Sequence, residues 1–101
     1  MKDLCDVFTA ELLRLIAEAE ALGCRMGRLK KDVGQYGGVE TVREYLRKNR
    51  LSDDFDRLAE LNRLDLSMEA LTVRSKFGTL FTDDEVNLCF ERLCAAGYYT
   101  F

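Results

Sequence analysis

The chain has 101 residues, of which 48% are hydrophobic and 33% are charged, and this is the composition of one globular domain. It contains no histidine, which excludes histidine-based acid–base catalysis and histidine-ligated metals, and no proline, which excludes a proline-rich linker. Its formal net charge of −3 at pH 7 is not typical of proteins that bind nucleic acid without sequence specificity.

The N-terminal segment has the clearest helical pattern. Its apolar residues recur every three or four positions, which places them on one face of a helix. They are Leu4, Phe8, Leu12, Leu15, Ile16, Ala19 and Leu22. Gly23 and Gly27 bracket the break that follows, so we assign an amphipathic helix to residues 1–23.

Two helices are predicted in the middle of the chain, joined at a pair of glycines. Gly37 and Gly38 stop the first of them, because glycine lowers helix propensity and permits positive φ. The first helix carries Met26, Leu29, Val33 and Tyr36, and the second carries Val39, Val42, Tyr45 and Leu46. The sequence therefore predicts a corner between two helices at residues 37–38.

Two serines mark the next helix starts. Ser52 is the predicted N-cap of a helix whose first turn contains Asp53 and Asp54, where the helix dipole favours negative charge. The apolar stripe of this helix is Phe55, Leu58, Leu61 and Leu64. Ser67 is predicted to cap a second short helix.

The last helix has the strongest local signal. Thr82 and Glu85 form a capping box, in which the hydroxyl and the carboxylate each accept from a backbone N–H at the helix start. Phe81 and Val86 flank the box as a hydrophobic staple does, and Gly97 lies where the helix is expected to end.

These patterns predict an all-α fold, a compact bundle of five or six short helices in which the first helix is the longest. We expect a single helical domain over residues 1–101, in which residues 24–101 form a helical module after the N-terminal helix. The predicted core contains Phe8, Leu12, Leu15, Leu46, Phe55, Leu58, Leu61, Leu71, Phe90 and Leu93.

The four cysteines are expected to be reduced and to serve as small buried hydrophobes. Cys5 and Cys24 lie near opposite ends of the first helix, roughly 28 Å apart at ~1.5 Å per residue, which is too far for a disulfide. Cys89 and Cys94 project in different directions from one helix, and no pair has the spacing of a zinc site. Charged residues interrupt the N-terminal apolar run, so we expect no secretory signal. No apolar stretch without charges is long enough to span a bilayer, so we expect no membrane partner. We also expect a cytoplasmic protein without metal or cofactor.

No arrangement of residues predicts catalysis. Asp53, Asp54 and Asp56 lack the glycine and the final glutamate of a calcium-binding EF-hand. Gly37 and Gly38 lack the preceding strand and the lysine of a phosphate-binding loop. A cysteine nucleophile would have no histidine to activate it, so the chain is not expected to be an enzyme.

Charge is distributed unevenly, because residues 25–50 are basic and the segments before and after them are acidic. The basic stretch fits contact with an acidic protein surface or with phosphates. It equally fits a solvated helix face with internal ion pairs. The candidate partner-binding residues of this stretch are Arg43, Arg47, Lys48 and Arg50.

Three tyrosines complete the candidate contact residues. Tyr36, beside two glycines, would anchor an interface if its side chain were exposed. Tyr98 and Tyr99 belong to an aromatic C-terminal run, which either packs into the chain's own core or docks on a partner subunit. A homo-oligomer is one of the expected arrangements, because the first helix has more apolar surface than a short bundle can cover.

Three blocks of the chain resemble a small helical module of uncharacterised bacterial and phage-linked proteins. They read YGGVET (residues 36–41), RLDLSMEAL (63–71) and LFTDDE (80–85), and the resemblance covers roughly residues 26–99. It implies a module without catalytic residues, here in a stand-alone version. It also implies an accessory protein of a phage or mobile element that binds and inhibits a host defence machine, as an anti-CRISPR protein does.

We therefore expect a non-enzymatic protein-interaction module with a protein partner. Two alternatives stay open. One is a nucleic-acid-binding helical regulator that uses residues 25–50, whose affinity would fall steeply with salt. The other is an oligomer that sequesters a nucleotide ligand between subunits, with arginines as clamps.

Overall fold

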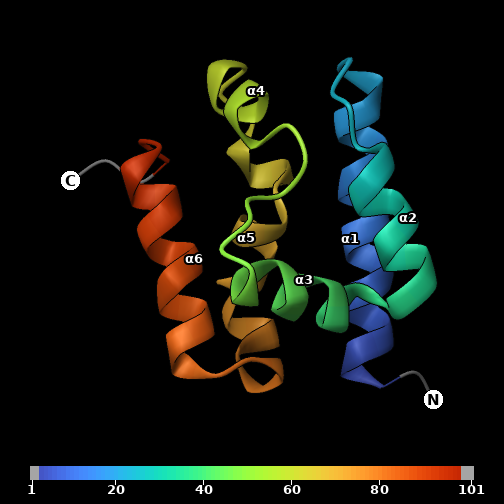
Figure 1. Ribbon diagram of the computed structural model, residues 1–101, viewed down its shortest axis with the longest axis vertical. Coiled ribbons are helices and arrows are strands. Elements are labelled where there is room, and N and C mark those ends of the chain that lie inside the picture. The colour runs from blue at the N-terminus through green and yellow to red at the C-terminus, as the bar shows by residue number, and fades with distance from the viewer. Residues whose placement is uncertain (1–2, 99–101) are drawn as a thin grey trace.

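Residues 3–98 are described by the computed structural model and fold into six α-helices and two 3₁₀ helices, without a strand (Figure 1). In chain order these are α1 (Leu4–Ala21), α2 (Gly27–Tyr36), α3 (Gly38–Arg47), α4 (Phe55–Glu60), η1 (Leu64–Leu66), α5 (Met68–Thr72), η2 (Ser75–Leu80) and α6 (Asp83–Ala95). The all-α prediction is confirmed, and α1 is the longest helix of the described residues, as expected. Among residues 3–98, no helix combines the length and the apolar character that crossing a bilayer requires.

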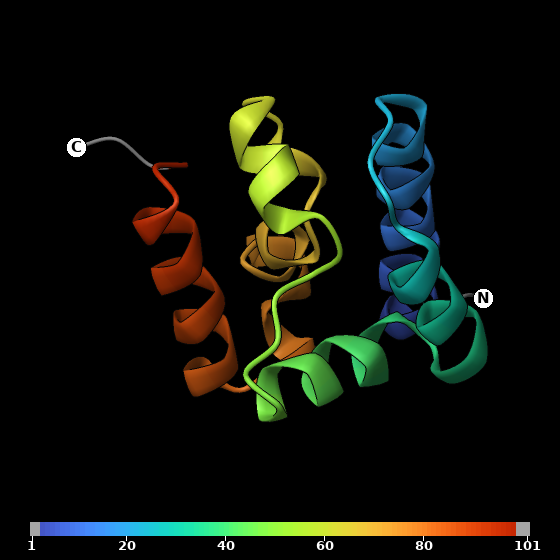
Figure 2. The same ribbon diagram turned by 45° about the horizontal axis from the view of Figure 1, so that its top comes forward.

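Helix α3 connects the two halves of the molecule. α1 and α2 lie side by side in one half, and α4, α5 and α6 make up the other (Figure 1). α3 crosses between the halves and packs against α1, α2 and α6 (Figure 2). The elements on both sides of the α2–α3 connection are therefore held in place by contacts with the rest of the bundle.

The corner predicted at residues 37–38 is present and tightly packed. Gly37 has a φ of +85°, which L side chains rarely adopt, and it separates α2 from α3. The Gly38 N–H donates to the Thr9 hydroxyl at 2.9 Å, so α3 begins directly on α1. A Cβ atom at Gly38 would lie 2.9 Å from Cδ1 of Phe8, so a larger residue would force a shift.

Four helices end in a Schellman motif, in which a residue in the left-handed region follows the last turn. At the end of α6, Gly97 is that residue, and the Tyr98 N–H donates to the Leu93 carbonyl at 2.9 Å. The predicted helix end at Gly97 is therefore confirmed. The corresponding residues after α1, α3 and α4 are Gly23, Asn49 and Asn62.

The capping box predicted for the last helix is confirmed. The Thr82 hydroxyl accepts from the Glu85 N–H at 3.1 Å, and the Glu85 carboxylate accepts from the Thr82 N–H at 2.7 Å. Phe81, just before the box, is buried against Phe8 of α1, with ring centroids 5.2 Å apart. Phe77 of η2 contacts the same ring edge-on at 5.0 Å, so these aromatic rings hold the start of α6 near α1.

The helix start predicted at Ser52 is wrong, because the acidic residues that follow it cap a different helix. Asp54, not Ser52, is the N-cap residue of α4. The Asp53 carboxylate accepts from the Leu29 N–H at 2.7 Å, and the Asp54 carboxylate accepts from the Arg25 N–H. The first bond satisfies a backbone donor in the first turn of α2, whose own N-cap residue provides no side-chain hydrogen bond, and the second satisfies a donor just before that helix.

Eight of the ten predicted core residues are buried, and the two exceptions are Leu61 and Phe90, which are 39% and 40% exposed. Leu61 leaves the buried face because α4 ends one residue earlier. On α6 the buried residues are Cys89 and Leu93, so the inward face is rotated away from Phe90.

The interior contains a buried carboxylate that the sequence analysis missed. Glu69 of α5 is fully buried, and its carboxylate accepts from the N–H and the hydroxyl of Ser52 at 3.1 and 2.8 Å. Its Oε2 lies 3.7 Å from Nη1 of Arg92 on α6. Burial raises the pKa of Glu69, and the Ser52 hydrogen bonds and the Arg92 charge oppose that rise. This network joins the loop before α4 to α5 and α6.

All four cysteines have free thiols. Cys24 and Cys89 are buried as expected, and burial raises the pKa of Cys89 to about 12. Cys5 is exposed on α1, and Cys94 is half-buried on α6. The expectation of small buried hydrophobes is therefore correct for Cys24 and Cys89 and wrong for Cys5, because Cys5 lies outside the inward face of its helix.

Candidate binding groove between α2 and α3

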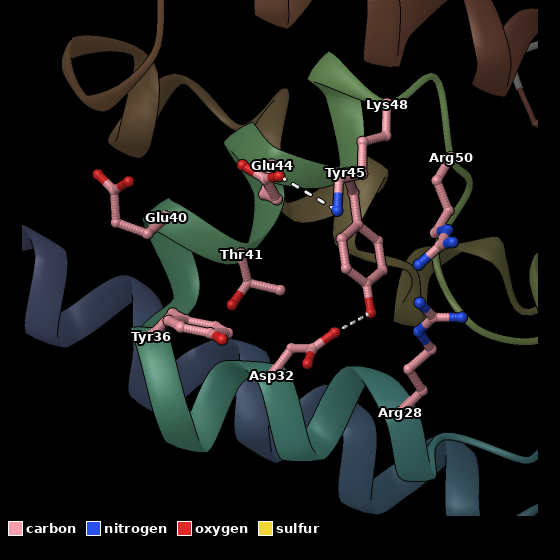
Figure 3. Close-up of a pocket in the computed structure, with 9 residues that line it drawn as sticks. All are labelled: Arg28, Asp32, Tyr36, Glu40, Thr41, Glu44, Tyr45, Lys48 and Arg50. Carbon is pink, nitrogen blue, oxygen red and sulfur yellow. Dashed lines mark hydrogen bonds and ion pairs between the residues drawn. The ribbon is translucent and has the colours of Figure 1, made fainter.

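A groove of about 460 Å³ runs between α2 and α3 (Figure 3). Most of its lining residues are four apart, because side chains at this spacing share a helix face. Those of α2 are Arg28, Asp32 and Tyr36, and the others are Glu40, Thr41, Glu44, Tyr45, Lys48 and Arg50. The corner at Gly37 turns the two faces toward each other.

A hydrogen bond between the two helices lies at the base of the groove (Figure 3). The Tyr45 hydroxyl donates to the Asp32 carboxylate at 2.7 Å, and Tyr45 is only 3% exposed. Burial, together with this carboxylate, raises the pKa of Tyr45 well above its usual range, so the phenol stays protonated and donates. The Thr41 hydroxyl donates to the Gly37 carbonyl at 2.7 Å. The base of the groove is thus a set of satisfied polar contacts.

Charges of both signs line the groove. The basic side chains are Arg28, Lys48 and Arg50, and the acidic ones are Asp32, Glu40 and Glu44. Glu44 pairs with Lys48 at 3.3 Å and also with Arg47 at 3.1 Å. Because the opposite charges are equal in number, the groove as a whole does not favour a polyanion.

Tyr36 lies at the end of the groove next to the corner (Figure 3). Its side chain is 60% exposed, the largest fraction among the large hydrophobic residues of the described chain. Tyrosine and arginine are enriched among the residues that dominate the free energy of protein–protein binding. An exposed tyrosine ring beside a groove that contains arginines is therefore of the kind that anchors a protein–protein interface.

Arg43 and Arg47 line a second groove, of about 470 Å³, between α3 and α6. Nε of Arg43 lies 3.5 Å from Oε2 of Glu85, and its Nη2 donates to the Leu80 carbonyl at 3.2 Å. Arg43 therefore holds α3 to the start of α6. The other lining residues are Leu46, Thr82, Asp84, Glu85 and Leu88.

The remaining predicted contact residues fall in different places. Tyr36, Lys48 and Arg50 are brought together in the α2–α3 groove. Tyr98 follows the end of α6, where it is 39% exposed. Tyr99 lies outside the described residues. The structure thus brings three of the predicted contact residues together in a single groove. Side chains of α2 that were not predicted as contact residues line the same groove.

The sequence analysis missed Arg28, Asp32 and Tyr45 as groove residues. A signal was present, because Arg28, Asp32 and Tyr36 are four residues apart, and the next helix repeats this spacing from residue 40 to residue 48. The sequence does not show that the corner brings these two stripes face to face.

Within residues 3–98, no three histidine, cysteine, aspartate or glutamate side chains are grouped so that they could hold a metal ion. No protein-family model matches the chain, and no curated protein and no solved structure is significantly similar to it. A function is therefore inferred from the chemistry of the α2–α3 groove.

Proposed function

We propose that the chain is a non-enzymatic protein-interaction module whose α2–α3 groove binds a segment of a partner protein. The observation that carries this proposal is the exposure of Tyr36 at the end of the groove. Burial of such a ring contributes strongly to binding at the centre of protein interfaces. The polar groups of the groove base are engaged with one another, which suits recognition better than proton transfer.

Nucleic-acid binding through residues 25–50 has less support. Arg43, Arg47 and Lys48 each have a nitrogen within 3.5 Å of a carboxylate oxygen of Glu44 or Glu85. Phosphates would have to compete with these internal pairs, and this lowers the electrostatic free energy that a duplex could gain. The interpretation of the basic stretch as a helix face with internal ion pairs explains these three residues.

The identity of the partner is proposed from the resemblance to phage-linked modules. On that basis the chain is an accessory protein of a phage or mobile element that binds and inhibits a host defence machine of the CRISPR type. Free thiols at all four cysteines fit the reducing cytoplasm, where such a machine acts. The mixed charge of the groove fits a protein surface better than nucleic acid.

Affinity capture from a nuclease-treated host lysate tests this function. The wild-type chain is compared with Tyr36→Ser and with Leu13→Ser, which shortens a 38% exposed apolar side chain on α1 outside the groove. The wild type and Leu13→Ser are expected to retain the same protein, and Tyr36→Ser to lose most of it. Capture that Tyr36→Ser leaves unchanged, or capture of nucleic acid alone from untreated lysate, would overturn the proposal.

A further inference from the structure

Arg28 and Arg50 point toward each other at the end of the groove that lies opposite Tyr36 (Figure 3). Within residues 3–98, neither guanidinium forms an ion pair with a carboxylate. Two positive charges therefore share one end of the groove without a direct counter-ion. Like charges at short range repel, so an anion between them would be favoured.

Two acidic side chains, Asp32 in the groove and Asp53 beside the first turn of α2, act as hydrogen-bond acceptors. The Asp32 carboxylate accepts from the Tyr45 hydroxyl at 2.7 Å, and the Asp53 carboxylate accepts from the Leu29 N–H at 2.7 Å. Other basic side chains near the groove do have partners, as Lys48 shows by pairing with Glu44 at 3.3 Å. Among the basic residues that line the groove, Arg28 and Arg50 lack an ion-pair partner within residues 3–98, whereas Lys48 has one.

The backbone that carries both arginines is anchored. The Arg50 N–H donates to the Tyr45 carbonyl at 2.8 Å, and the Arg50 carbonyl accepts from Nη1 of Arg92 at 3.0 Å. The Arg50 guanidinium lies over the Tyr45 ring, 5.7 Å from its centroid. Arg28 lies in the first turn of α2, where Asp53 caps the Leu29 N–H. The backbone positions of both arginines and the guanidinium of Arg50 are thus held in place before an anion binds, which lowers the entropy cost of binding.

We propose that Arg28 and Arg50 form an anion subsite that binds a carboxylate of an acidic segment of the partner protein. This inference rests on the proposed function, since it assigns the chemistry of the segment that the groove would hold. The planar guanidinium matches the geometry of a carboxylate and binds it through two parallel hydrogen bonds. Tyr36 would then contact an apolar or aromatic part of the same segment at the other end of the groove.

The rest of the groove favours a carboxylate over a polyphosphate. Asp32, Glu40 and Glu44 line it between and beside the two ends, and their charge would repel a ligand that carries several negative charges. A peptide offers a single negative charge to the arginines and neutral groups to the acidic walls. ATP and inorganic phosphate are therefore competing ligands that the experiment tests, not the expected ligand.

Selection from a display library of random dodecapeptides provides the probe. Peptides selected by the full wild-type chain are expected to be enriched in aspartate or glutamate, or to bind through a free C-terminal carboxylate. Affinities of a selected peptide are then measured for wild type, for Arg28→Gln with Arg50→Gln, and for Arg25→Gln with Lys31→Gln. The last pair removes the same charge from exposed positions outside the groove.

The groove variant is expected to bind the acidic peptide about tenfold more weakly or worse, and the control variant to bind it almost as well as wild type. Replacing the acidic residue of the peptide by its amide should weaken binding to wild type by a similar factor. It should not weaken binding further to the groove variant, because the same interaction is already lost. The peptide change leaves the protein intact, so a folding defect cannot imitate this result.

The outcomes separate the two proposals. If the selected peptides need Tyr36 for binding but are not enriched in acidic residues, the proposed anion subsite is wrong. The proposal that the groove binds a protein segment would still be supported. Failure to select any peptide whose binding depends on Tyr36 would overturn the proposed function itself. Tighter binding of ATP or inorganic phosphate than of the acidic peptide, lost in the groove variant, would overturn the assignment to a carboxylate.

Discussion

Tyr45 donates a hydrogen bond of 2.7 Å to the carboxylate of Asp32, and this contact joins α3 to α2 beneath the candidate groove. The two residues are 13 apart in the sequence, and the corner at Gly37 brings them together. The bond fixes the distance between the two helices that form the groove walls. The shape of the proposed binding surface therefore depends on a contact that lies beneath that surface.

Tyr45→Phe tests this contact directly. The variant should lower the free energy of unfolding by about 1–2 kcal/mol, because Asp32 loses a donor in a partly buried position. Tyr36→Phe removes a hydroxyl from an exposed tyrosine and should change stability by less than about 0.5 kcal/mol. Urea unfolding followed by circular dichroism measures both, and equal effects would contradict the assigned role of Tyr45.

Substitution by alanine is predicted to change stability in opposite directions at two glycines. Gly38→Ala should destabilise the fold by about 1–3 kcal/mol, because the added methyl group would lie 2.9 Å from Phe8 and 3.1 Å from the Thr9 backbone. Gly34→Ala should stabilise it by about 0.5–1 kcal/mol, because Gly34 is inside α2 and its Cβ would have open space. Thermal unfolding of the two variants distinguishes them. Shifts of the same sign would show that the α1–α3 contact is looser than described.

The raised pKa of Glu69 predicts how the stability of the fold changes with pH. Burial raises the pKa of Glu69 above its usual 4.5, so the folded chain holds this proton more tightly than the unfolded chain. The stability that Glu69 contributes is therefore complete below pH 4.5 and is lost as the pH rises through the raised pKa. Glu69→Gln cannot titrate, so the unfolding free energy of wild type minus that of the variant should fall over this range.

A series of urea titrations at increasing pH measures that difference. It should level off once the carboxyl is ionised in both the folded and the unfolded chain. A difference that rises with pH would mean that Arg92 and the Ser52 hydrogen bonds stabilise the carboxylate more than burial destabilises it.

The internal pairs of the basic stretch predict weak nucleic-acid binding. We expect no measurable binding of a fluorescent DNA duplex at physiological salt, because Arg47 and Lys48 already share Glu44. Fluorescence anisotropy at low and at physiological salt checks this expectation. Tight binding that falls steeply with salt and that Lys48→Gln weakens would favour the nucleic-acid alternative.

Local signals in the sequence were sufficient to predict most of the helices. The apolar spacing of α1, the Thr82–Glu85 capping box and the Gly37–Gly38 corner each depend on residues that are close in the chain. The helix start at Ser52 was wrong because Asp53 hydrogen-bonds to Leu29, 24 residues away, and no local rule predicts such a partner.

Neither the groove nor the buried carboxylate could be predicted from the sequence, because both depend on the tertiary structure. Glu69 follows a capping serine and so resembles an exposed acidic residue in a first helical turn, yet Ser52 and Arg92 converge on it in the interior. The groove residues are visible in the sequence as two stripes with four-residue spacing. Their meeting depends on the backbone geometry at Gly37, which the sequence predicts only as a corner.

Site-specific photo-crosslinking tests the central claim that the α2–α3 groove binds a protein partner. A photoreactive phenylalanine analogue replaces Tyr36 in one full-length variant and Leu13, which is exposed on α1 outside the groove, in a control. On irradiation in host cells, the analogue at position 36 should crosslink to one distinct protein that the analogue at position 13 does not capture. Absence of such a product at position 36, or the same products at both positions, would contradict the assignment of this groove as the binding site.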